Sequence, residues 1–160
     1  PAEATLELSI RYPDDETGER MREQLHRIVG AEAEASGAVT PPTFVTEQVL
    51  PPTLNDAAAT ARTIDAFRGA FGAQTVFDPG LTGGSEDVSW LARDAGVPLV
   101  FWFLGGADPA AFAAARAAGT VESDIPSNHS PFYAPVIQPT LAHGVQAPTV
   151  AALEWLATKA

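Results

Sequence analysis

The stretch Thr5-Leu-Glu-Leu-Ser-Ile-Arg11 decides the predicted fold, because apolar and polar residues alternate strictly along it. Alternation with a period of two is typical of a β-strand that buries one face. Pro13-Asp14-Asp15 follows and supplies a turn and acidic residues for a helix start. The apolar residues of that helix share one face, at Met21, Leu25, Ile28 and Val29, and we expect it to end near Gly37.

A second strand candidate, Thr43 to Leu50, ends at Pro51-Pro52. Consecutive prolines resist both helix and sheet pairing, so they mark the best domain boundary in the chain. Residues 1–52 are therefore a strand–helix–strand unit, and residues 53–160 a second part.

Beyond the prolines, strand and helix patterns alternate. The first expected helix runs from Asn55 to about Phe71 and buries Ile64, Phe67 and Phe71. The second begins at a Ser85 cap and ends at about Asp94. Two more are expected over 108–118 and over 140–158, the last with an interruption at Pro148. Short strands are expected at Thr75–Phe77 and 98–104, and a long loop over 119–135. Alternating strands and helices predict an α/β fold with parallel pairing.

The composition limits the possible partners. The 160 residues carry a net charge of −11 and no basic cluster, so we expect neither nucleic acid nor an anionic membrane as a partner. No run approaches the roughly 20 apolar residues that cross a bilayer. The start of the chain has no signal-peptide pattern, and the absence of cysteine excludes disulfides and thiolate ligands within it. These features fit a cytoplasmic protein.

Ser127-Asn128-His129-Ser130-Pro131 lies inside the long predicted loop, where functional residues are common. A neutral imidazole is a frequent zinc ligand, so His129 is a candidate metal ligand. The alternative is a solvated surface histidine, which the residues alone favour.

Gly84, Ser85 and Glu86 lie at a predicted strand-to-helix junction, where free N–H groups can bind a substrate carboxylate. The alternative is an ordinary helix cap, because Ser followed by acidic residues is common there. His26 and His143 have no partner at metal-ligand spacing, and we expect structural roles for them. Arg11 follows the first predicted strand, where an ordinary surface charge is expected.

Taken in order, several short motifs resemble the C-terminal portion of the dinuclear-metal amidohydrolase, aminoacylase and carboxypeptidase family that includes hippurate hydrolase. They are Leu8-Ser9-Ile10-Arg11, Leu54-Asn55-Asp56, Gly84-Ser85-Glu86-Asp87, Gly96-Val97-Pro98, Leu104-Gly105-Gly106 and Asn128-His129-Ser130-Pro131-Phe132. Val88 replaces the usual Phe of the third motif, Gln138 stands near a place that is commonly acidic, and Pro148 interrupts a helix that is usually smooth.

The resemblance implies that 1–52 is the second half of a small α+β lid and dimerisation domain, and that 53–160 is the C-terminal part of an α/β metallo-hydrolase domain. It implies that His129 is a metal ligand and that Gly84, Ser85, Glu86 and Arg11 contact substrate. Two divalent ions per complete enzyme, zinc or alternatively manganese, are expected. The substrate would be an N-acyl amino acid or a related small amide.

The same resemblance implies that the other metal ligands and the general-base glutamate lie upstream, so this chain alone is expected to be inactive. Its expected partners are the missing N-terminal half and a second copy bound through the lid domain. A second hypothesis is a non-catalytic binding or assembly module that retains the fold. A serine hydrolase using Ser85 and His129 lacks the elbow sequence of that class.

Overall fold

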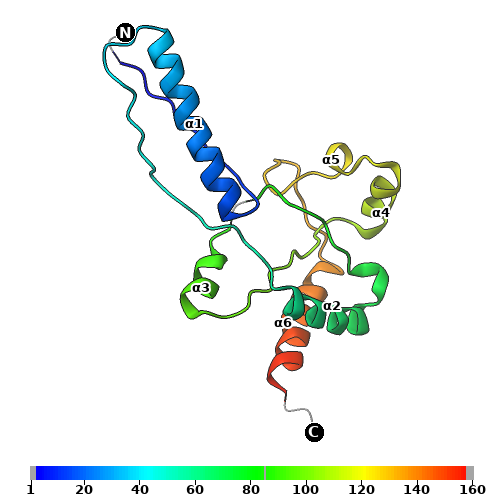
Figure 1. The fold of residues 1–160 in the computed structure, drawn as a ribbon. Helices are drawn as coiled ribbons and strands as arrows, with labels where there is room; N and C mark the ends of the chain where they lie inside the picture. Colours follow the sequence, from blue (N-terminus) through cyan, green and yellow to red (C-terminus); the bar gives the residue numbers. More distant parts are fainter. Residues whose placement is uncertain (1–2, 85, 158–160) are drawn as a thin grey trace. The chain divides into compact units, whose positions relative to one another are not determined.

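The computed structural model describes residues 3–84 and 86–157, and in that part the fold is all-helical (Figure 1). The elements are α1 (Asp15–Ala35), α2 (Ala57–Phe71), the short 3-10 helix η1 (Ala73–Thr75), α3 (Val88–Ala95), α4 (Pro109–Ala118), α5 (Val121–Asp124) and α6 (Thr140–Leu156). No residue of these ranges lies in a strand. The predicted α/β fold is therefore wrong for the described residues, and with it the α/β metallo-hydrolase and α+β lid architectures that the resemblance implied.

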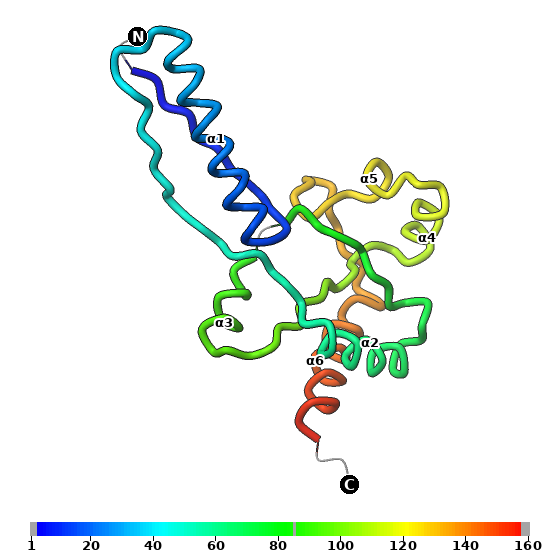
Figure 2. The backbone as a smooth tube through the Cα atoms, viewed as in Figure 1, coloured from blue at the N-terminus to red at the C-terminus, as the bar shows by residue number. Residues whose placement is uncertain are grey.

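None of the four predicted strands is a strand in the structure. Thr75 of the third is the last residue of η1, and the rest of the four segments is extended or irregular (Figure 2). No backbone–backbone hydrogen bond involves residues 4–10 or 43–50 in the described part of the chain. The apolar residues of the first segment also remain exposed, with Leu6 at 84% and Leu8 at 59%. An alternating pattern shows that a segment could bury one face of a strand. The segment forms a strand only where a neighbouring strand pairs with it and another surface covers its apolar face.

The chain divides into two compact units. The first contains the described residues of Pro1–Ala59 and of Asp78–Val100, and the second contains Thr60–Phe77 and those of Phe101–Ala160. The predicted division at Pro51-Pro52 into two functional domains stays a prediction.

In the first unit, α1 begins and ends as its sequence indicates. The Asp14 carboxylate accepts a hydrogen bond of 2.7 Å from the backbone N–H of Thr17, which caps the helix. At the other end Gly37 has a φ of 71°, in the left-handed region, where glycine carries no steric penalty. The predicted start and end of this helix are thus confirmed.

Helix α3 also belongs to the first unit, and it starts later than predicted. Its N-cap is Asp87, and the predicted cap, Ser85, lies outside the described residues. The hydroxyl of buried Ser89 donates to the carbonyl oxygen of Pro51 at 3.0 Å, which fixes the helix to the double proline. Gly96 ends the helix with a φ of 63°.

Helices α2 and α6 supply the small core of the second unit. Phe67, Ala147 and Ala151 are buried, and Phe71, Val76 and Val150 pack against them. The Phe67 ring also meets the Trp102 ring edge-on at 5.2 Å. Of the three α2 residues expected to be buried, Phe67 is buried, and Ile64 and Phe71 are half-buried.

At the start of α2 the Asp56 carboxylate accepts a hydrogen bond of 2.8 Å from the Ala59 N–H, so Asp56 contributes to the cap beside the predicted Asn55. Helix α4 lies within its predicted range, and the Asp108 carboxylate caps it by accepting from the N–H groups of Ala110 and Ala111. The predicted loop over 119–135 contains the single-turn helix α5, and α6 runs through Pro148 as one helix.

Within the described residues, none of the helices combines the length and the apolar character that a membrane span needs.

Candidate functional site

His129 lies on an exposed turn of the second unit. The turn follows α5 and is closed by a hydrogen bond of 2.9 Å from the Ser130 N–H to the Ser127 carbonyl oxygen. The Ser130 hydroxyl then accepts from the Phe132 N–H at 3.2 Å, and the Ser130 carbonyl accepts from the Tyr133 N–H at 3.1 Å. These local bonds fix the backbone that carries the imidazole, while the residue itself is open to solvent.

The described residues contain no group of three or more His, Asp or Glu side chains placed to hold a metal ion. Tight zinc binding requires three or four protein ligands around the ion. His129 has the right chemistry for one of them, but the residues around it do not form a metal site. The two-metal centre that the resemblance implies does not fit this part of the chain by itself.

Of the predicted Gly84–Glu86 site, Glu86 lies at the start of a helix. The Glu86 carboxylate folds onto the beginning of α3 and accepts from the N–H of Asp87 at 2.9 Å and, more loosely, from that of Val88 at 3.4 Å. It therefore occupies N–H groups that a substrate carboxylate would need. Gly84 is exposed, and Ser85 is outside the described residues. This arrangement favours the helix-cap interpretation of Glu86, and a contact between Gly84 and substrate stays a prediction.

Arg11 is exposed at the end of the first extended segment. It belongs to the first unit together with Gly84 and Glu86, whereas His129 belongs to the second. A common site for these residues remains a prediction from the resemblance.

The other two histidines contact aromatic rings. His26, which is exposed as expected, lies 4.0 Å from the Phe44 ring, centroid to centroid, and His143 lies 5.2 Å from the Phe71 ring. These contacts favour the structural roles expected for them.

A polar cluster that no sequence pattern indicated joins α2 to α6. The Arg62 guanidinium binds the Glu154 carboxylate at 2.6 Å, donates to the Glu154 backbone carbonyl, and lies 4.1 Å above the Trp155 ring. The Trp155 indole N–H donates to the Thr63 hydroxyl at 3.2 Å. Because the polar groups of the cluster are engaged with one another, it acts as a structural tie and offers no open site for a ligand.

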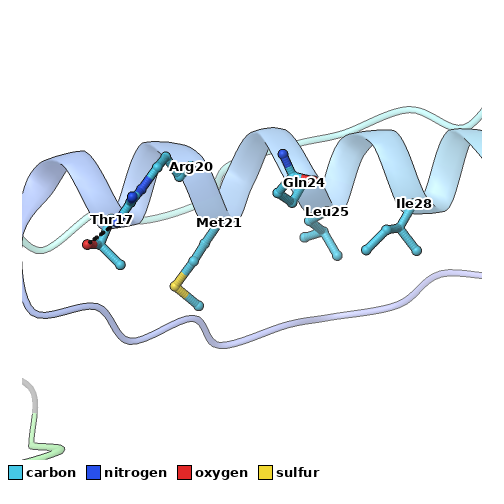
Figure 3. Close-up of a pocket in the computed structure, with 6 residues that line it drawn as sticks. All are labelled: Thr17, Arg20, Met21, Gln24, Leu25 and Ile28. Atoms are coloured by element: carbon cyan, nitrogen blue, oxygen red, sulfur yellow. Dashed lines mark hydrogen bonds between the residues drawn. The ribbon is translucent and has the colours of Figure 1, made fainter.

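An open apolar groove runs along α1, with a volume of about 380 Å³. Figure 3 shows Met21, Leu25 and Ile28 pointing toward the extended segment before the helix. Thr17, Arg20 and Gln24 complete the lining. The groove has no titratable pair and no cluster of polar groups, so its chemistry suits the binding of an apolar surface.

A scan against known protein families finds no family model that matches the chain.

Proposed function

We propose that this chain is the C-terminal part of a metal-dependent amide hydrolase that acts on N-acyl amino acids or related small amides. The observation that carries the proposal is the ordered series of motifs that ends at Asn128-His129-Ser130-Pro131. The exposure of His129 supports it, because an imidazole open to solvent is accessible to a metal ion held mainly by other residues.

In this proposal the activity belongs to the complete enzyme. Two metal ions, zinc or alternatively manganese, would supply an activated water when bound. This chain would contribute one nitrogen ligand, from His129, on a turn whose backbone is fixed by Ser127 and Ser130. The remaining ligands and the general-base glutamate would come from polypeptide outside these 160 residues. A cytoplasmic location fits the absence of cysteine.

The test uses the complete reading frame that encodes this chain, with N-benzoylglycine and an N-acetyl amino acid as probes. His129→Ala is expected to lower metal content, measured by elemental mass spectrometry, and to lower hydrolysis more than about 100-fold, since even outer-shell changes cost about 10- to 100-fold. His26→Ala is the matched control, because His26 is also exposed but contacts only Phe44 in the described rings. Unchanged metal content and activity in His129→Ala would remove His129 from the site.

A non-catalytic assembly module is the second candidate. It is favoured by the absence of a three-ligand group in residues 3–84 and 86–157 and by the many exposed apolar side chains there. Metal content separates the two candidates. A complete protein that binds no zinc or manganese and cleaves neither probe would support the module.

A further inference from the structure

The turn that carries His129 is tied to a distant part of the chain at Gly106. The hydrogen bonds that shape the turn all lie within residues 127–133. Among the backbone–backbone hydrogen bonds that residues 126–137 make in the described part of the chain, one reaches a distant segment. It runs from the Val136 N–H to the Gly106 carbonyl oxygen at 2.9 Å. The place of the His129 turn within the second unit therefore depends on this contact.

Gly106 is required by lack of space and not by its backbone angles, since its φ lies outside the left-handed region. A Cβ atom added there would lie 2.9 Å from the Tyr133 hydroxyl oxygen and 3.2 Å from the Pro135 Cβ, closer than nearly all real Cβ contacts. The adjacent Gly105 differs, because nothing lies within 4 Å of a Cβ added to it. The chain that follows the His129 turn can therefore approach this closely only if residue 106 has no side chain.

The other end of the same short segment is seated on α6. The Leu104 Cδ2 atom lies 3.1 Å from the position of a Cβ added at Gly144, a residue of α6. Helix α6 supplies part of the core of the second unit. Leu104–Gly106 thus joins a core helix to the chain that leaves the His129 turn. A functional side chain has to be held within about 0.5 Å of its productive position, and this connection provides such a hold.

We propose that Gly106 is a positioning residue for His129. By admitting Tyr133 and Val136 against its backbone, it sets where the exposed imidazole stands in the second unit. Its effect on metal binding rests on the proposed function, in which His129 joins ligands from polypeptide outside this chain. The contact itself needs no metal, so the two statements can be tested separately.

The first test examines the turn in the absence of metal. The complete protein is stripped with EDTA, and hydrogen exchange is followed by mass spectrometry in peptides that cover 127–136. Gly106→Ala is expected to raise exchange there about tenfold, because the added methyl group displaces Tyr133 and loosens the turn. Gly105→Ala is the matched control and is expected to leave this exchange unchanged.

Peptides from α2 report on the second unit as a whole, and their exchange is expected to be the same in both variants. Faster exchange of α2 in Gly106→Ala would overturn the positioning role, because Gly106 would then support the entire unit. Unchanged exchange over 127–136 in Gly106→Ala would overturn it as well.

Tyr133→Phe provides a rescue. It removes the hydroxyl oxygen, which is the atom nearest to the added methyl group, and leaves the contact with Pro135 in place. The double variant Gly106→Ala/Tyr133→Phe is therefore expected to regain most of the lost protection, and Tyr133→Phe alone to change little. Without this rescue the effect of Gly106→Ala would not act through Tyr133, and the proposal would fail.

The second test measures the zinc affinity of the complete protein in competition with a chelator. Gly106→Ala is expected to weaken zinc binding about tenfold, since changes beside metal ligands cost about 10- to 100-fold. Gly105→Ala is expected to match the unmodified protein, and the double variant to recover. Faster exchange over 127–136 with unchanged zinc affinity would overturn the positioning role. If the unmodified protein binds no zinc, the proposed function fails, while the exchange comparison still decides whether Gly106 fixes the His129 turn.

Discussion

The ring of Tyr12 lies against the backbone of Gly18 in the first turns of α1. A Cβ atom added at Gly18 would lie 2.8 Å from two ring carbons of Tyr12 and 2.9 Å from a third, closer than real Cβ contacts. Gly18 is accordingly buried, although it lies on a helix whose other residues are partly or fully exposed. The missing side chain at position 18 is what allows the incoming segment to pack onto the helix.

Gly18→Ala is therefore expected to lower the free energy of unfolding by about 1–2 kcal/mol. The overpacking of the Tyr12 ring costs about 1–3 kcal/mol, and the gain of up to about 1 kcal/mol in helix propensity offsets only part of it. Urea denaturation followed by far-UV circular dichroism measures the change.

Gly30 provides the matched control in the same helix, because nothing lies within 4 Å of a Cβ added there. Gly30→Ala is expected to raise stability by about 0.5–1 kcal/mol, the ordinary advantage of alanine in a helix. A stabilising effect of both substitutions would contradict the role given to Tyr12.

Ser89→Ala is expected to destabilise the first unit by about 1–2 kcal/mol. The Ser89 side chain is only 2% exposed, and its loss would leave the Pro51 carbonyl oxygen buried without its donor. Ser36→Ala is the control, because the Ser36 hydroxyl makes a comparable hydrogen bond to Ala33 in an exposed position. Surface changes of that kind usually stay within about 0.5 kcal/mol. Equal effects of the two substitutions in urea denaturation would contradict a specific role for the Ser89 bond.

The helices could be predicted from sequence because their signals are local. Asp14 and Asp108 cap the helices that follow them, and Gly37 and Gly96 end the helices that precede them, all through bonds or dihedral angles within a few residues. Such effects need no knowledge of distant residues. At the start of α2 the sequence offers two adjacent residues of similar capping strength, Asn55 and Asp56, and the Asp56 carboxylate accepts the Ala59 N–H.

Strand pairing could not be predicted reliably, because it depends on partners that a local pattern does not identify. Thr5–Arg11 has the alternation of a strand, yet no other described segment pairs with residues 4–10. Long-range contacts between side chains could not be predicted for the same reason. Arg62 and Glu154 are 92 positions apart in the sequence, and nothing near either residue indicates the other.

The same difference between local signals and long-range contacts applies to the candidate site. The sequence placed His129 in an irregular, accessible segment, and the structure has it on an exposed turn. The role of Glu86 was ambiguous between substrate contact and helix cap until the bonds to Asp87 and Val88 favoured the cap. A metal centre assembled from distant residues has no local signature, which is why the proposal of one rests on the order of motifs alone.

Arg62→Lys is expected to lower the free energy of unfolding by about 1–2 kcal/mol. Lysine keeps the charge, but it cannot donate to the Glu154 carboxylate and carbonyl together while stacking on Trp155. Arg22→Lys is the control, since the Arg22–Glu19 pair is an i,i+3 surface pair on α1, a kind worth only about 0.3–0.5 kcal/mol. Urea denaturation with tryptophan fluorescence as the readout compares the two, and a loss no larger for Arg62→Lys would contradict the tie between α2 and α6.

Acid is expected to weaken the N-terminus of α1 through Asp14. The backbone N–H of Thr17, and then its hydroxyl and the nearby Arg20 charge, lower the pKa of the Asp14 carboxyl below its ordinary value. Because the pKa is lower in the folded state, the stabilisation is present above the unfolded value of about 3.9 and is lost as the pH falls below it toward the folded pKa. Asp14→Asn keeps a capping oxygen but cannot titrate. Between about pH 6 and about pH 2, α1 is therefore expected to lose less stability in Asp14→Asn than in the unmodified chain. Thermal unfolding followed by circular dichroism at about 222 nm measures the loss in each protein. Equal losses in the two proteins would show that protonation of Asp14 does not control the acid sensitivity of this helix.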